Sequence, residues 1–553
     1  MTARRRVAVV TGGGGGIGGA IAEELGRVGW FVVTVDPLVT LDGSAPLTDA
    51  GDTTAGRIVA AGGAAQASAA SVTDGDAIGG LFRELADQHG GLDAVVNVAG
   101  ITRQSYFAQG SEEDWIALLS VHLGGYLNVL NAALPLMAAA GYGRILGVTS
   151  GSGWRAADAG GYSAAKRAVA ALTWQLGATA PPGVAVNAIS PIANTRMVAA
   201  ALERARQAGK AGGGGGLSLN SMPGPEDLGP LGAHLVSDEF GWCTGQVLFA
   251  AGSEVAVVDQ PRLLEVVRTD GVAALDHVLE SVIPRAFAAA ESTQATNGGS
   301  NPRFGPIFEE AGSAAPPSEK VSTCAVVSDR PAMTAALTTA LEARSVACHQ
   351  AEVGRDFGGA AAALGRIVET TGPVDAIVVA LAGRDAATSA EPWQLVLSDH
   401  QGLIGELHAD AAWARAAADY AAASGRTVQL VTLTDATNPS GRSRAQASAQ
   451  LARAAASATG TRVTAFAASI EAPESEAGGP TAELVTHLLT HPEAGALAGA
   501  ELAVGRGWIG LRRHPRATGT VAYGGPAVPS WLDATLREMV GTGRPETFAG
   551  EAG

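Results

Sequence analysis

Residues 7–18 read Val7-Ala8-Val9-Val10-Thr11-Gly12-Gly13-Gly14-Gly15-Gly16-Ile17-Gly18, and an amphipathic helix pattern follows over residues 21–28. A short β-branched run bounded by glycines is typical of a buried parallel strand. Glycines let the backbone turn tightly and let a pyrophosphate approach the next helix N-terminus, where free N–H groups favour anions. Five consecutive glycines are also compatible with low-complexity slack, but the flanking strand and helix favour a dinucleotide-binding loop.

The next predicted strand, Phe31–Val35, ends at Asp36. This is about 20 residues beyond the glycine loop, where an acidic side chain binds the adenosine ribose hydroxyls and repels a 2′-phosphate. No arginine lies in the glycine loop or directly after Asp36 to receive that phosphate. We therefore expect NAD(H) and not NADP(H); the alternative is that Asp36 only caps a helix or turn.

Further strand and helix patterns alternate along the first half of the chain. Strands are predicted at Ala94–Asn97, Arg144–Thr149 and Val184–Ile189, with helices at Trp115–Met137 and Tyr162–Leu176. Such alternation is typical of a parallel, doubly wound α/β sheet, whose ligands bind at the carboxyl ends of the strands.

Lysine is rare in this chain. Only Lys166, Lys210 and Lys320 occur among 37 basic residues, and Lys166 stands four residues after Tyr162. An ammonium is a compact point charge that a guanidinium does not replace, so retention of Lys166 indicates a role beside the Tyr162 phenol. Survival of one lysine by chance is the alternative. Abundant Ala, Gly and Arg with little Lys is typical of a GC-rich bacterial genome.

Composition narrows the class of protein. The net charge of −16 over 553 residues argues against a nucleic-acid partner. Cys243, Cys324 and Cys348 are widely spaced, which indicates buried thiols in a reducing cytosol and no metal site or disulfide. The apolar run after Arg4-Arg5-Arg6 is too short for a signal peptide, and we find no stretch of ~20 apolar residues for a membrane span. We expect a soluble, cytoplasmic protein without a membrane partner.

Five motifs over residues 5–252 resemble the short-chain dehydrogenase/reductase family, in the family's order. They are Thr11-Gly12-x3-Gly16-Ile17-Gly18, Asn97-Val98-Ala99-Gly100, Ser150, Tyr162-x3-Lys166 and Asn187-Ala188-Ile189-Ser190-Pro191. Within the family, the segments Val121-His122-Leu123, Tyr162–Lys166 and Pro191–Met197 are most similar to the dehydrogenase unit of type-2 multifunctional enzymes. That unit oxidises 3-hydroxyacyl-CoA.

The resemblance implies roles for individual residues. Tyr162 is the expected general base for alcohol oxidation and general acid for carbonyl reduction, and Lys166 is expected to lower its pKa, together with the nicotinamide cation, and to bind the nicotinamide ribose. Ser150 is expected to hydrogen-bond the substrate oxygen. The expected cofactor contacts are Gly12, Gly16, Ile17, Gly18, Asp36, Asn97, Ala99, Gly100, Tyr162, Lys166, and, at the carboxamide, the backbone of Ile192 and the hydroxyl of Thr195.

The sequence departs from the family pattern at four places. His122 replaces the catalytic asparagine, so it either anchors the relay water, with a titration near neutrality, or is inert packing. Val98 replaces a second asparagine, and Ser71 stands where an acidic residue is expected near the adenine. The segment between Ser150 and Tyr162 is one residue shorter than usual, so we expect a reshaped loop there.

The chain continues well beyond the family's last strand. We predict a catalytic NAD-binding domain over 1–255, a helical extension and linker over 256–319 with helices at Leu263–Val267 and Leu275–Phe287, and a second domain over 320–553. Inside the first domain, residues 198–222 are rich in glycine and contain Arg204, Arg206 and Lys210. They suggest a substrate lid that meets the phosphates of an acyl-CoA, or else a solvated helix end and loop.

The last 230 or so residues repeat the pattern without its chemistry. Val374–Gly383 is similar to Leu92–Gly100, but Ser328-Asp329-Arg330-Pro331 replaces the glycine loop and Arg444–Gln450 takes the place of Tyr-x3-Lys. We predict a degenerate, non-catalytic copy that replaces the second subunit of a dehydrogenase pair, so that a homodimer forms a pseudo-tetramer. The alternative is that this half binds a carrier protein, a product or a regulator.

The sequence thus predicts two Rossmann-type α/β domains in tandem. The expected activity is NAD-dependent interconversion of a secondary alcohol and a ketone, first of all on a 3-hydroxyacyl thioester. A tailoring ketoreductase or epimerase of a polyketide-like or terpenoid metabolite is the alternative enzyme. A NAD-sensing binding protein is the alternative from another class, although a sensor has no need of the Ser150/Tyr162/Lys166 set.

Overall fold

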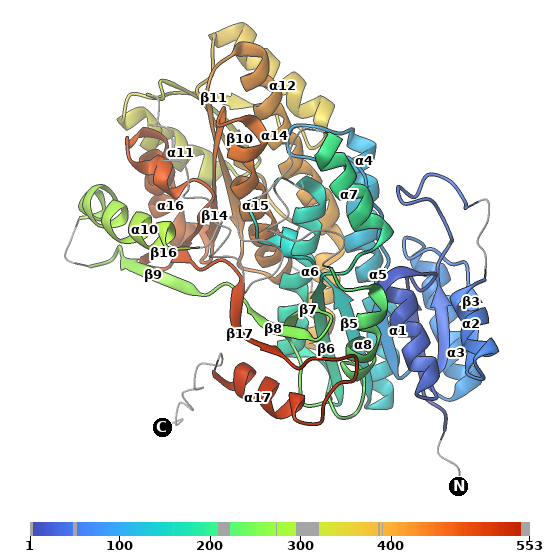
Figure 1. Ribbon diagram of the computed structural model, residues 1–553. Coiled ribbons are helices and arrows are strands. Elements are labelled where there is room, and N and C mark those ends of the chain that lie inside the picture. Colours follow the sequence, from blue (N-terminus) through green and yellow to red (C-terminus); the bar gives the residue numbers. More distant parts are fainter. Residues whose placement is uncertain are drawn as a thin grey trace.

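The computed structural model shows two α/β halves, each built around a mainly parallel sheet (Figure 1). It describes residues 4–47, 52–156, 158, 160–207, 222–271, 274–294, 320–384, 388–389 and 391–542. The nine-stranded sheet has the order β17-β8-β7-β6-β5-β4-β1-β2-β3, and the eight-stranded sheet β11-β10-β12-β13-β14-β15-β16-β9. The predicted fold class, two doubly wound Rossmann-type domains in tandem, is confirmed.

The first half follows the predicted alternation of strands and helices. Its strands are β1 (Val7–Thr11), β2 (Phe31–Val35), β3 (Ala64–Ser68), β4 (Ala94–Asn97), β5 (Gly143–Val148), β6 (Val184–Pro191), β7 (Val247–Ala251) and β8 (Glu254–Asp259). Its helices are α1 (Gly16–Arg27), α2 (Thr54–Ala60), α3 (Gly75–His89), α4 (Glu112–Leu119), α5 (Gly125–Ala140), α6 (Gly160–Thr179), α7 (Arg196–Gln207) and α8 (Gly229–His234). The central strands are buried on both faces, as their continuous apolar runs predict.

The second half begins before residue 320. Its strands are β9 (Leu263–Arg268), β10 (Thr323–Ser328), β11 (Ala347–Ala351), β12 (Ala376–Ala380), β13 (Val428–Asp435), β14 (Val463–Ile470), β15 (Glu501–Gly505) and β16 (Trp508–Arg512). Its helices are α9 (Leu275–His277), α10 (Ile283–Ser292), α11 (Pro331–Ala343), α12 (Phe357–Thr371), α13 (Pro392–Asp399), α14 (Leu403–Ser424), α15 (Pro439–Thr459) and α16 (Glu474–Thr490). The order β11-β10-β12-β13-β14-β15-β16 repeats β2-β1-β4-β5-β6-β7-β8 of the first sheet.

The two halves exchange their edge strands. Strand β9 follows β8 in the chain but pairs antiparallel with β16 of the second sheet. In return, β17 (Arg516–Ala522) follows β16 but pairs antiparallel with β8 of the first sheet, and α17 (Leu532–Thr542) packs on that half (Figure 1). Each half therefore completes the sheet of the other.

The helix predicted at Leu263–Val267 is wrong, because this segment is strand β9. Its side chains alternate between more and less exposed positions, a period of two, and its backbone groups are satisfied by the β16 ladder. Tertiary pairing with a strand over 240 residues away therefore overrides the local apolar pattern. The helix predicted at Leu275–Phe287 does form, as α9, a π-turn at Val278–Val282 and α10. Residues 295–319 of the predicted linker lie outside the described residues.

Helices α6 and α15 pack against each other and join the halves. Arg167 on α6 forms an ion pair with Glu501 at the start of β15, and both side chains are buried. His514 hydrogen-bonds Glu501 and also Glu291 on α10. A buried charge is tolerated when it is paired and hydrogen-bonded, so this cluster requires both halves to be in place.

The segment Glu112–Ala140 is the one helix of the described chain that is long and apolar enough to span a membrane. The expectation that no stretch reaches this length is therefore wrong by length and composition. More than half of its most apolar window is buried inside the protein, where α5 packs on α3 and α4 on α14. It is a core helix of this fold.

Candidate active site

A cleft of about 500 Å³ opens at the carboxyl ends of the strands in the first sheet. The glycine loop and Asp36 line one end, and Ser150, Tyr162 and Lys166 line the other. This is the edge at which doubly wound sheets bind ligands. One elongated molecule can therefore contact both groups of residues at once.

The glycine loop has the backbone geometry that its sequence predicts. Gly12 and Gly16 adopt φ values of +64° and +54°, a region that other residues rarely occupy. A Cβ atom on Gly12 would also lie 2.8 Å from the Ala99 amide nitrogen. Helix α1 begins at Gly16, so its free N–H groups face the cleft, as a pyrophosphate site requires. These residues fit a dinucleotide.

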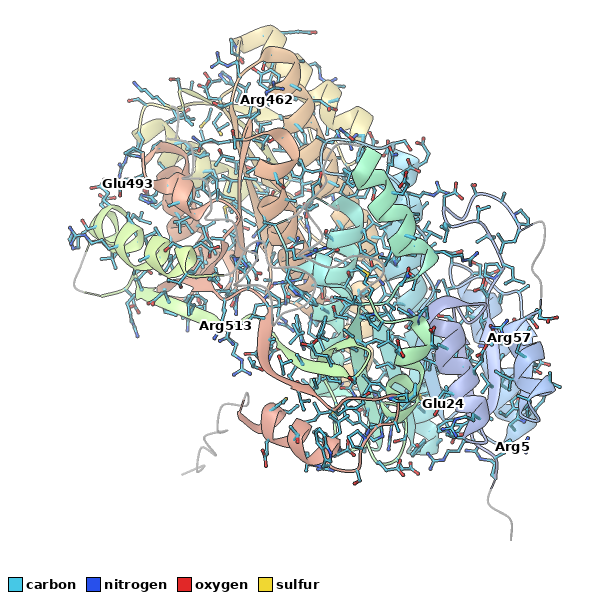
Figure 2. The ribbon with its side chains drawn as sticks, viewed as in Figure 1. Arg5, Glu24, Arg57, Arg462, Glu493 and Arg513 are labelled. Atoms are coloured by element: carbon cyan, nitrogen blue, oxygen red, sulfur yellow. The ribbon has the colours of Figure 1, made fainter. Side chains whose placement is uncertain are left out.

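Asp36 lies where β2 ends, directly beside the glycine loop. Its carboxylate accepts hydrogen bonds from the amides of Gly14 at 3.0 Å and Leu38 at 2.8 Å. Arg57 on α2 (labelled in Figure 2) also lines the cleft. Its guanidinium pairs with Glu23. Sequence analysis missed Arg57, because its distance along the chain from Asp36 carries no motif.

Ser150, Tyr162 and Lys166 converge as predicted. Ser150 lies two residues beyond the end of β5 and shares a side-chain hydrogen bond with Tyr162. Lys166 is one helical turn beyond Tyr162 on α6, with its Nζ 5.8 Å from the centre of the Tyr162 ring. The Lys166 ammonium donates a 2.7 Å hydrogen bond to the Val148 carbonyl.

The electrostatics of Tyr162 differ from the expectation. Burial raises the pKa of the Tyr162 hydroxyl, while the Ser150 hydrogen bond and the charge of Arg155 act in the opposite direction. Burial also lowers the pKa of Lys166, to about 7, so this side chain is only partly protonated near neutral pH. Removal of the Lys166 ammonium from water disfavours its charged form, which is the form expected to stabilise the Tyr162 phenolate.

His122 lies behind Tyr162 in the π-turn Ser120–Gly124, with the two rings edge to face at 5.1 Å. Burial and the charge of Lys166 lower the pKa of His122 to about 3, so the titration near neutrality that the sequence allowed is wrong. Its Nε2 lies 2.8 Å from the Ile101 carbonyl oxygen, whereas Nδ1 is buried without a partner. The Ile101 amide also donates to Nε2 at 3.2 Å. A neutral imidazole whose Nδ1 is unused is compatible with either a water anchor or packing.

Most of the expected cofactor contacts line the cleft, and four do not. Those that line it, with the expected catalytic residues, are Gly12, Gly16, Ile17, Asp36, Gly100, His122, Ser150, Tyr162, Lys166 and Thr195. Asn97 is buried and bonds Thr11, which ties β4 to β1. Ile192 is also buried, and its amide donates to the Ala250 carbonyl, so this N–H is not free for a carboxamide. Gly18 and Ala99 support the glycine loop from behind.

The shortened loop between Ser150 and Tyr162 contains a second residue that sequence analysis missed. The positive charge of Arg155 acts to lower the pKa of the Tyr162 hydroxyl. The Nη2 of Arg155 also donates a 3.2 Å hydrogen bond to the Ser152 hydroxyl. The Ser152 amide in turn donates to the Ser150 hydroxyl. The short spacing indicated a reshaped loop, but nothing in it showed that an arginine would lie near Tyr162.

The predicted lid is described only in part. Residues 196–207 form helix α7, which contains Arg204 and Arg206, and Arg196 lines the cleft. Lys210 and the glycine run at 212–216 lie outside the described residues.

The corresponding end of the second sheet is closed by ion pairs. Arg330, in place of the glycine loop, pairs with Glu474 at 2.8 Å. Arg444 pairs with Asp410 at 2.7 Å, and both side chains are buried. The two arginines are therefore already neutralised by carboxylates and are not free to bind a pyrophosphate. In the described residues, no group of three His, Cys, Asp or Glu side chains is placed to hold a metal ion.

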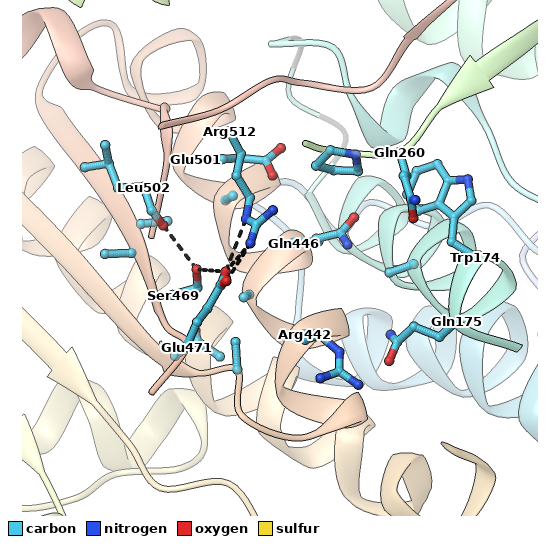
Figure 3. Close-up of a pocket in the computed structure, with 18 of the residues that line it drawn as sticks. Trp174, Gln175, Gln260, Arg442, Gln446, Ser469, Glu471, Glu501, Leu502 and Arg512 are labelled. Carbon is cyan, nitrogen blue, oxygen red and sulfur yellow. Dashed lines mark hydrogen bonds and ion pairs between the residues drawn. The ribbon is translucent and has the colours of Figure 1, made fainter. Parts of the chain in front are cut away.

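A second cavity, of about 320 Å³, lies between the halves (Figure 3). Trp174 and Gln175 of α6 face Ser469 and Glu471 across it (Figure 3). Its carboxylates are paired within the protein, since Glu471 binds Arg512 and Glu501 binds Arg167. The cavity is therefore formed where the two halves meet, and its carboxylates are not available as free charges for a ligand.

Comparison with known proteins identifies the family. The family profile described as short chain dehydrogenase matches residues 6–206. Nodulation protein G of Azospirillum brasilense is 31% identical over 44% of this chain and 96% of its own length. Acetoacetyl-CoA reductase of Allochromatium vinosum is 32% identical over 43% of this chain and 94% of its own. Peroxisomal multifunctional enzyme type 2 of Mus musculus is 36% identical over 35% of this chain and 26% of its own. The chain belongs to the short chain dehydrogenase family and is an oxidoreductase of the Rossmann type, as the five motifs predicted.

Proposed function

We propose that the protein is an NAD-dependent dehydrogenase that interconverts a secondary alcohol and a ketone. The observation that carries this proposal is the cleft itself, with Asp36 and the glycine loop at one end and Ser150, Tyr162 and Lys166 at the other. The carboxylate of Asp36 suits the ribose hydroxyls of NAD and opposes the 2′-phosphate of NADP.

Each residue has a defined task in the proposed reaction. Ser150 holds the substrate oxygen, and the Tyr162 hydroxyl takes the alcohol proton in oxidation and returns it in reduction. Lys166 passes from the Val148 carbonyl to the nicotinamide ribose when the cofactor is present. NAD, when bound, supplies the hydride acceptor and a positive charge that favours the Tyr162 phenolate. The unused Nδ1 of His122 is a site for the relay water.

The substrate class that the relatives suggest first is a 3-hydroxyacyl thioester. Two of these relatives are named for acyl-CoA reduction or as multifunctional peroxisomal enzymes. A tailoring ketoreductase or epimerase of a polyketide-like or terpenoid metabolite would use the same residues. We place the reaction in the cytoplasm and expect a homodimer in which each second half takes the place of a further subunit.

We infer that the second half is a duplicated domain that no longer binds a dinucleotide and supports the first. Its strand order repeats that of the first sheet, and its counterpart of the cofactor loop is filled by Arg330 and Glu474. It also contacts the loop after Ser150, where Gln450 donates to the carbonyls of Ser152 and Arg155.

The first test is titration of the full chain with NADH and NADPH, followed by nicotinamide fluorescence. Tighter binding of NADH, together with NADH formation from at least one secondary alcohol, supports the proposal. NADH binding without turnover of any alcohol favours the alternative of a NAD-sensing protein. No binding of either cofactor contradicts the proposed function.

A further inference from the structure

Arg155 is an uncompensated cation beside the proposed catalytic residues. Burial lowers the pKa of its guanidinium, and its Nε is buried without a hydrogen-bond partner. Within the described residues, no carboxylate forms an ion pair with it. A guanidinium held away from water without a counter-charge is costly, which makes Arg155 a candidate for binding an anionic ligand.

The surroundings of Arg155 connect it with the reacting atoms. Its Nη2 donates to Ser152, and the Ser152 amide donates to the hydroxyl of Ser150, which is hydrogen-bonded to Tyr162. The guanidinium is also close enough to affect the charge of the Tyr162 hydroxyl. An anion bound by Arg155 would therefore lie next to the substrate oxygen that Ser150 and Tyr162 hold.

The loop that carries Arg155 is fixed from the other side. Gln450 of α15 donates to the Arg155 carbonyl at 2.7 Å, and Ser457 donates to the Ala156 carbonyl at 2.9 Å. The nearby carboxylate of Asp158 accepts hydrogen bonds from the amides of Phe107 and Gly160. The backbone of this loop is thus held by the second half, while Nε of Arg155 remains without a hydrogen-bond partner.

We propose that Arg155 binds an anionic group of the substrate, so that this site acts on a hydroxy acid and the corresponding keto acid. A planar guanidinium with unused donors suits a carboxylate, which it can bind through two parallel hydrogen bonds. An aliphatic 3-hydroxyacyl thioester carries a neutral carbonyl at this place. The proposal rests on the proposed dehydrogenase function and replaces the thioester with an anionic substrate class.

The test compares two ketones that differ in one charge, acetoacetate and methyl acetoacetate. Both are titrated into the NADH complex of the full chain with Tyr162→Phe, which prevents turnover, and nicotinamide fluorescence reports binding. We expect acetoacetate to bind about 10- to 100-fold more tightly, the factor of a charge-assisted hydrogen bond. Arg155→Met should remove this preference, and Arg155→Lys should keep part of it.

Arg103→Met is the matched control, because Arg103 lies in the same half but is paired with Asp114. It should keep the full preference for acetoacetate. Arg155→Met should also melt no lower than the parent, since it removes an unpaired buried charge. The proposal is overturned if the ester binds as tightly as the acid, if neither ketone binds, or if the preference survives in Arg155→Met. Loss of NADH binding by the parent itself would instead contradict the proposed function.

Discussion

Arg415 in the second half donates a 2.8 Å hydrogen bond to the carbonyl oxygen of Gly110 in the first half. The same guanidinium also donates to the carbonyls of Tyr106 and Phe107. In the same segment, the Ser105 carbonyl accepts from the amide of Gly161, the residue before Tyr162. One arginine of the non-catalytic half thereby fixes the backbone that borders the start of the catalytic helix.

Arg415→Ala is expected to lower kcat/KM roughly tenfold, because misplacement of the segment beside Tyr162 spoils the reacting geometry. NADH affinity should change less than threefold or so, since the cofactor contacts are elsewhere. Steady-state kinetics and fluorescence titration measure the two effects. Arg426→Ala, at a surface ion pair with Asp375 of the same half, is the control. Full activity of Arg415→Ala would show that the second half does not position this segment.

Tyr162→Phe should reduce turnover by about 10² to 10⁴-fold, because the proton relay loses its acid and base. Binding of NADH should remain, since the ring and the glycine loop are unchanged. Tyr142→Phe is the matched control, because the Tyr142 hydroxyl only bonds Arg6 and Asp238 at the surface. Residual turnover close to that of the parent would exclude Tyr162 as the proton carrier.

Asp36→Asn is expected to shift the cofactor preference toward NADPH by about tenfold, because it removes the charge that repels the 2′-phosphate. The amide oxygen of asparagine can still accept one of the two backbone hydrogen bonds. Competitive titration with NADH and NADPH measures the change. If the unmodified protein already prefers NADPH, Arg57 is the candidate phosphate ligand, and Arg57→Ala should then abolish that preference.

Lys166→Met should stabilise the protein while abolishing activity. The pKa of Lys166 falls from ~10.4 in the unfolded chain to about 7 in the folded protein. Below pH 7 both states bind the proton, so the folded state carries the full desolvation cost; above pH ~10.4 neither binds it and the cost vanishes. We expect the Tm gain, about 2–5 °C, to be largest at or below pH 7 and to shrink as the pH rises toward 10. A gain that grows with pH would contradict this.

Removal of residues 516–553, which contain β17 and α17, should destabilise the first half although they belong to the end of the chain. The deletion uncovers the edge of β8 and removes Leu532 and Leu536, which are fully buried against the first half. We expect a lower Tm, which calorimetry measures, and aggregation, which light scattering detects. Removal of residues 543–553 alone is the control. A soluble, fully active protein lacking 516–553 would show that the strand exchange is dispensable.

Local sequence patterns were enough to predict the fold class and the residues at both ends of the cleft. The run Val7–Gly18 and the alternation that follows are local patterns, because strand propensity and the wide φ range of glycine depend on the residues themselves and their near neighbours. Asp36, Ser150, Tyr162 and Lys166 were placed for the same reason, since each stands at the end of a strand or on the helix that follows one. Parallel strands bring such positions to a single edge.

The features that join distant segments depend on tertiary contacts and could not be predicted from the sequence. Leu263–Arg268 and Arg516–Ala522 become strands by pairing across the halves, and no local signal distinguishes such a partner. The positions of Arg57 and Arg155 at the active site, and of Arg415 on the segment beside it, depend on loops whose paths the sequence pattern does not define. The pKa values of Lys166 and His122 also follow from burial, which exists only once the chain has folded around them.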